Sequence, residues 1–184
     1  ILYVTEYDPI IETTTKTLKQ KPVSIKYNYK GKVYEKVPDE LDYEVLKKIG
    51  SQKVPLNFLN SAIEGGDEIS RVLNAGITKS SQLFYKRSLL YLNELLSHAK
   101  DKNGYDYEFL FSITSIIQRA SKLFRWSSNH AGPLMGTYYI ASLILEVSPK
   151  KLLHNKKNIS KDLPTLGIKG YSVNQVASAS QIAT

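Results

Sequence analysis

The chain of 184 residues contains no cysteine. This absence excludes disulfide bonds, thiolate nucleophiles and zinc sites with cysteine ligands. Long apolar runs are also missing: the longest, at residues 140–147, is interrupted by Ser142 and Glu146. A membrane-spanning helix needs about 20 consecutive, mostly apolar residues, so the sequence predicts no such helix.

Motifs of catalytic and metal sites are missing as well. The three histidines, His98, His130 and His154, lack the His-x-x-x-His or Glu-x-x-His spacing that places two metal ligands on one helical face. The chain has no Gly-x-Ser-x-Gly elbow, phosphate-binding glycine loop or dinucleotide fingerprint. The acids Glu64, Asp67 and Glu68 are expected to cap short helices. The sequence therefore predicts neither an enzyme nor a bound metal or cofactor.

Positive charge is what the chain has in excess. Its formal net charge is +8 and its pI is near 9.4, which favours an anionic partner, either nucleic acid or an acidic membrane surface. Seven lysines lie between residues 16 and 36, against the single acid Glu35. We interpret residues 1–37 as an N-terminal arm rather than part of a packed domain, because they contain little apolar area to offset the entropy of their own ordering.

Two structures are compatible with this arm. Residues 23–29 alternate weakly, and Lys30-Gly31-Lys32 can form the turn of a two-stranded surface ribbon. The alternative is a segment that becomes ordered only on its partner. We expect a short helix over about 9–20, followed by an extended or hairpin segment over 23–37.

Residues 38–148 contain the kinds of residue that commonly start and end helices, and they are predicted to form a helical-bundle core. Asp39 is an acid in a first helical turn, and Lys47 and Lys48 close that helix before Gly50. Further helices are expected at 55–64, at 67–75 with Gly76 after it, and at 79–100, 106–126 and 134–147. Pro149 is expected to end the last helix, before an extended C-terminal tail at 149–184. The predicted fold class is mainly α: a compact helical bundle with an N-terminal arm and an extended C-terminal tail.

The short turn at 101–104 makes the two longest predicted helices antiparallel, so the basic start of one meets the basic end of the other. Ser112 and Ser115 share a stripe with Arg119 and Lys122, where their hydroxyls can donate to phosphates. No zinc finger, basic zipper or other base-reading motif is present, so we expect binding to backbone and shape rather than to sequence. The predicted DNA-binding residues are Lys16, Lys19, Lys21 and Lys26 of the arm and Lys79, Lys86, Arg87, Arg119, Lys122 and Arg125 of the helices.

Part of this region resembles a known family. Residues 68–78 and the helix after them contain Ser-x-Val-Leu, then Gly-Ile-Thr, a serine, a tyrosine and a leucine-rich stretch. This order is similar to that of the major capsid proteins of rod-shaped and filamentous archaeal double-stranded DNA viruses, the rudiviruses and lipothrixviruses. The resemblance covers residues 67–96 closely and 67–147 loosely. The matching positions are Ser70, Val72, Leu73, Gly76, Ile77, Thr78, Ser81, Tyr85, Leu92 and Leu95.

The resemblance implies a structural coat protein of a helical nucleocapsid. Its dimers would stack along double-stranded DNA, hold the DNA in A-form and wrap a helical N-terminal arm around it. The lysine-rich arm, the extra residues 1–60 and the long C-terminal tail differ from the rudivirus pattern and point to the lipothrixviruses. The implied partners are DNA, a paralogous coat protein or a second copy of this chain, neighbouring filament subunits and an outer lipid envelope. The implied location is the virion, after assembly in the host cytoplasm.

Two other functions remain open from the residues themselves. A cellular or plasmid-encoded chromatin-like protein would bind duplex DNA in the same way without building a regular filament. A basic membrane-surface protein would place an amphipathic helix on anionic lipid.

Overall fold

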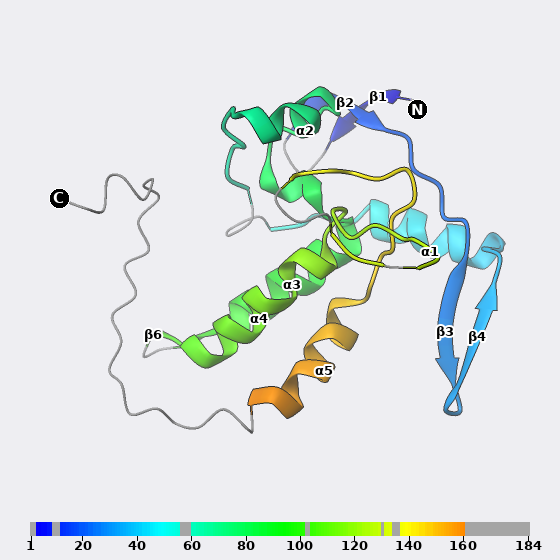
Figure 1. Cartoon of the computed structure of the whole chain (residues 1–184), viewed down its shortest axis with the longest axis vertical. Coiled ribbons are helices and arrows are strands. Elements are labelled where there is room, and N and C mark those ends of the chain that lie inside the picture. The colour runs from blue at the N-terminus through cyan, green and yellow to red at the C-terminus, as the bar shows by residue number, and fades with distance from the viewer. Residues whose placement is uncertain are drawn as a thin grey trace.

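The computed structural model describes residues 3–8, 12–55, 60–101, 104–129, 131–133 and 137–160, which form helices and short antiparallel hairpins (Figure 1). The strands pair as β1 (Tyr3–Asp8) with β2 (Thr13–Leu18), β3 (Ile25–Tyr29) with β4 (Lys32–Lys36), and β5 (Lys100–Asp101) with β6 (Gly104–Tyr105). The α-helices are α1 (Glu40–Gly50), α2 (Ser70–Asn74), α3 (Lys86–His98), α4 (Tyr107–Ala120) and α5 (Pro149–Ser160). The 3-10 helices η1 (Asp67–Ile69) and η2 (Ser80–Leu83) precede α2 and α3.

The predicted fold class, a mainly α helical bundle, is wrong. Of the residues that the structure describes, 43% are helical and 18% lie in strands, so the architecture is mixed. The predicted helix at 9–20 is the clearest error, because residues 13–18 form strand β2 and pair with β1. Four of these residues are threonines, whose branched Cβ is restricted in a helix and packs well in a strand.

The hairpin alternative for residues 23–37 is confirmed. Strands β3 and β4 pair in register from Ile25↔Lys36 to Tyr29↔Lys32. Lys30 and Gly31 form the two-residue turn with φ angles of 49° and 78°. Positive φ at both central residues is typical of the tight turns whose twist matches a hairpin.

The helix predicted after Pro38 is also confirmed, as α1. Asp39 accepts a hydrogen bond from the Asp42 amide, and the Asp42 carboxylate accepts one from the Asp39 amide. This reciprocal cap satisfies amides that the first helical turn leaves without partners. The Lys36 ammonium lies 2.8 Å from Asp39 and 2.7 Å from Asp42, which lowers the pKa of Asp39 and ties α1 to the end of β4.

The two long predicted helices are shorter than expected. The Gln82 side chain accepts hydrogen bonds from the amides of Thr78 and Lys79, which fixes a 3-10 turn instead of a helical start. Phe84 and Tyr85 are extended, so α3 begins only at Lys86. Helix α4 ends at Ala120, and the next residue, Ser121, forms an antiparallel bridge with Phe84. Between these limits α3 and α4 form the core through the fully buried Leu89, Leu92, Ile113 and Ile116.

The predicted organisation of residues 137–160 is wrong. The helix expected at 134–147 is absent where the structure describes this segment, because residues 137–148 are not helical. The Leu145 amide instead donates to the Phe124 carbonyl. In the region predicted as an extended tail, 149–184, the structure places helix α5. Pro149 is the first residue of that helix rather than a stop, a position that needs no amide donor. Leu152 and Leu153 bury one side of α5 against the α3–α4 core, while residues 161–184 lie outside the described part.

Two further short helices were predicted between α1 and residue 76. The one at 55–64 is wrong where the structure describes it, since residues 60–64 are not helical and Ala62 pairs with Lys79. The one at 67–75 is confirmed as η1 and α2, and Gly76 follows it with a φ of 83°.

Candidate nucleic-acid interface

The structure brings the two basic helix ends together, as the antiparallel arrangement predicts. The Lys122 amide donates to the Leu83 carbonyl over 2.7 Å, and Phe84 and Ser121 form an isolated antiparallel bridge. The segment before α3 and the segment after α4 are therefore in direct contact. Their cations, however, have different surroundings.

Three of the predicted DNA-binding cations bind groups of the protein itself. The Lys86 ammonium donates to the carbonyl of Gly50, the last residue of α1, where it faces the negative end of the helix dipole. Arg87 forms an ion pair with Glu146, and this hydrogen bond raises the pKa of Arg87. The Lys122 ammonium donates to the Gln82 carbonyl over 2.9 Å and lies 5.4 Å from the Tyr85 ring centre. These side chains connect α3 with α1, α3 with Glu146, and the chain that follows α4 with η2.

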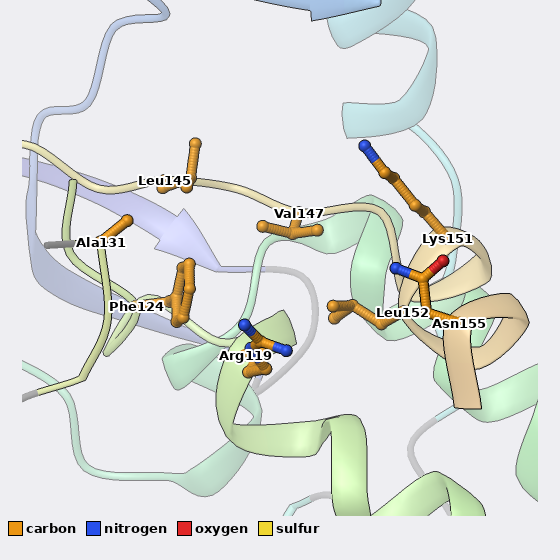
Figure 2. A pocket seen from close by; sticks show the side chains of 8 residues that line it. All are labelled: Arg119, Phe124, Ala131, Leu145, Val147, Lys151, Leu152 and Asn155. Atoms are coloured by element: carbon orange, nitrogen blue, oxygen red, sulfur yellow. The ribbon is translucent and has the colours of Figure 1, made fainter. Parts of the chain in front are cut away.

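Arg119 remains exposed at the same end of the molecule. Its guanidinium lies 5.6 Å from the centre of the Phe124 ring. Figure 2 shows it directed into a cavity of about 270 Å³, with Lys151 and Asn155 of α5 on the opposite side. No acid is among the lining residues, which are Arg119, Phe124, Ala131, Leu145, Val147, Lys151, Leu152 and Asn155.

Sequence reasoning missed Lys151 and Asn155 because it interpreted their segment as extended. The spacing of four residues between them was the available signal, since such a pair lies on one face if the segment is helical. The other two predicted residues of the helix ends differ from Arg119. Lys79 lies at the start of η2 and is half-buried, and Arg125 is half-buried where its backbone bridges to Gly132 and Ile144.

The predicted arm residues are all exposed. Lys16 lies in β2, Lys19 and Lys21 lie in the connection to β3, and Lys26 lies in β3. Lys26 forms an ion pair with Glu35 across the ribbon, with a nitrogen–oxygen distance of 3.3 Å. Lys30 and Lys32 at the ribbon tip are exposed too.

The positive charge of the protein is concentrated in two segments. Residues 16–36 contain seven lysines and one acid, and residues 149–160 contain four lysines and no acid. The rest of the chain has more acidic than basic residues, although the whole carries a net charge of +8. The excess positive charge therefore belongs to β2–β4 with their connections and to α5.

Other kinds of site find no support in the described residues. No three His, Asp or Glu side chains there are grouped so as to hold a metal ion. In the same residues no helix is both long enough and apolar enough to cross a membrane.

Comparison with known proteins yields no relative. No protein-family model matches the chain, and no curated protein or solved structure is detectably similar to it. The resemblance to viral coat proteins therefore rests on the sequence alone, closely over residues 67–96 and loosely over 67–147.

Proposed function

We propose that this protein is a structural protein that coats double-stranded DNA through the phosphate backbone, without reading base sequence. The observation that carries this function is the separation of charge: eleven lysines and one acid in two segments, on a chain that is otherwise slightly acidic. Lysines that neutralise phosphates release condensed counterions, which drives binding that is strong and independent of sequence. The solvent exposure of the arm lysines is consistent with this role.

The resemblance supports assembly of the bound copies into the helical nucleocapsid of a filamentous archaeal virus, with the DNA in A-form. Each copy forms a dimer with a second copy or with a paralogous coat protein, and the nucleocapsid lies inside a lipid envelope. One implied feature is not retained. The DNA-wrapping arm of this chain consists of hairpins in its described part, so it cannot wrap DNA as one long helix.

A basic membrane-surface protein is supported less well. The lysine-rich helix α5 is the natural candidate for lipid binding, but its Leu152 and Leu153 are only 7% and 9% exposed. An interfacial helix needs its apolar face available to enter the lipid. In α5 that face is already used by the α3–α4 core.

The test is a salt titration of the purified protein on one long duplex and on two duplexes of unrelated sequence. We expect equal affinities for the three and a steep linear fall of log K with log salt, by about 0.9 per neutralised phosphate. A shallow slope, or a strong preference for one sequence, would refute backbone coating. Regular filaments in electron micrographs of the complex would separate a coat protein from a chromatin-like one. Flotation with anionic liposomes, without any duplex binding, would favour the membrane function.

The sequence analysis places Arg119 and Lys122 on one helical stripe, but we expect their replacement to have different effects on DNA binding and on stability. Arg119→Gln should lower the salt slope by about one unit, because its exposed charge is available to a phosphate. Lys122→Gln should leave the slope unchanged and lower the free energy of unfolding by about 1 kcal/mol, because it loses its contacts with Gln82 and Tyr85. Duplex anisotropy and urea unfolding measure the two effects. An equal loss of slope in both variants would contradict this division.

A further inference from the structure

The β3–β4 ribbon stands out from the body of the protein as a separate element (Figure 1). All of its residues are exposed except Ile25 and Lys36, which are half-buried at its base. Two-stranded ribbons are normally stabilised by a third strand or a packed helix. The two faces of this ribbon are instead available to a partner.

The register places the tyrosines of the ribbon on one face. Directly opposed residues share a face, so Tyr27 and Tyr34 lie together, with Tyr29 and Lys32 as the next pair. The Tyr27 and Tyr34 rings stack with centres 5.6 Å apart, and the Lys30 ammonium lies 5.2 Å from the Tyr29 ring centre. The three tyrosines remain 44%, 56% and 42% exposed for positions 27, 29 and 34.

The single acid of the ribbon lies on the other face. Glu35 is opposite Lys26, and its carboxylate accepts a hydrogen bond from the Ser24 hydroxyl as well as pairing with that lysine. The tyrosine face and the tip therefore combine aromatic surface with Lys30 and Lys32 and include no ribbon carboxylate.

The charge of the ribbon decides between possible partners. Lysines along both strands oppose pairing of its edges with a second, identically charged ribbon, which is a common protection of edge strands. A polyanion suits the same lysines. Tyrosine rings and hydroxyls can contact the sugars and phosphates of a nucleic acid at a low entropy cost, because each side chain has only two χ angles.

We propose that the β3–β4 ribbon lies in the wide groove of the bound duplex, with its tyrosine face toward the DNA and Lys30 and Lys32 on the phosphates. Neighbouring strands are about 4.8 Å apart, so two strands fit a groove about 12 Å wide. That groove is the major groove of B-form DNA, whereas in an A-form duplex the minor groove is the wide and shallow one. This inference rests on the proposed duplex binding and adds the surface that makes the contact.

Photo-crosslinking tests the position of the ribbon directly. p-Benzoylphenylalanine is placed at Tyr29 in one full-length variant and at Tyr107 in another. Tyr107 is the matched control, since it is 73% exposed and is the first residue of α4. Helix α4 starts just after β6, which lies on the side of the molecule away from the ribbon (Figure 1). We expect a duplex crosslink from position 29 and none from position 107. Binding without a crosslink at 29, or with equal crosslinks at both, would overturn the ribbon contact while leaving the proposed function intact. Absence of duplex binding by the unmodified protein would refute the function itself.

A second measurement separates the aromatic contact from the charge. Tyr29→Ala should weaken duplex binding without changing the salt slope, because no cation is lost. Lys30→Asn combined with Lys32→Gln should lower the slope by about two units, and asparagine suits the positive φ of position 30. Lys47→Gln with Lys48→Gln on α1 is the charge-matched control, expected to leave the slope nearly unchanged. Equal slopes in the two double variants would contradict the proposed contact.

Discussion

Replacing Lys19, Lys21 and Lys32 together by glutamine is expected to weaken duplex binding about 10²- to 10³-fold at 0.1 M salt. All three are exposed lysines of the arm, away from the ion pairs that Lys26 and Lys36 form. Each phosphate contact contributes about 0.9 to the slope of log K against log salt, so each lost contact costs nearly a factor of ten at 0.1 M. Fluorescence anisotropy over a range of salt concentrations measures both the affinity and the slope.

The matched control removes the same charge from another surface. Lys47, Lys48 and Lys53 are also exposed, and they lie outside the lysine-rich arm. Their replacement by glutamine should reduce affinity by less than a factor of ten, through the weaker long-range field alone. If the two triple variants lost equal affinity, the DNA would be held by a diffuse positive field, and the arm would have no special role.

Gly76→Ala is expected to lower the free energy of unfolding by about 2–4 kcal/mol. Its φ of 83° lies in the left-handed region, where a side chain costs roughly 1–2 kcal/mol. A Cβ there would also stand 1.7 Å from the backbone carbonyl oxygen of Lys16, so β2 would have to move away. Urea unfolding measures the loss, and faster hydrogen exchange of the β2 amides would locate it.

Two other glycines separate the cost of the positive φ from the cost of the steric clash. Gly31 has a φ of 78° but no atom near its Cβ position, so Gly31→Ala reports the backbone cost alone. Gly65 has neither the positive φ nor a close neighbour, so Gly65→Ala should be nearly neutral. A Gly76→Ala variant no less stable than Gly31→Ala would show that β2 does not pack on Gly76.

Local chemistry made several elements predictable. The capping acid Asp39, the Lys30-Gly31 turn and the glycine after α2 each act within a few residues, through one amide, one φ angle or one carbonyl. The residues that make these interactions lie close together in the sequence, so the sequence alone is enough to predict each of these short segments. The helix expected at 9–20 was wrong because residues 13–18, with their four threonines, favour a strand and pair with β1.

The helix boundaries depended on contacts between distant residues. Helix α3 starts late because Gln82 caps the preceding turn and residues 83–85 lie along 121–122. Segment 149–160 is lysine-rich and has little helical signal of its own. It is a helix because Leu152 and Leu153 pack against the α3–α4 core. Tertiary burial, rather than propensity, supplies most of the stability of such helices.

The sequence by itself determined where the positive charge of this protein lies, since eleven lysines and one acid in two segments are a property of composition alone. It also determined the capped helix α1, the β3–β4 turn and the need for glycine at position 76. Only the tertiary structure decided which cations remain available. Lys86, Arg87 and Lys122 face a helix end, a glutamate and a carbonyl, whereas Arg119 faces a cavity shared with Lys151. The reason is physical: a cation's role depends on the groups within a few ångströms of it, and folding brings those groups from distant parts of the chain.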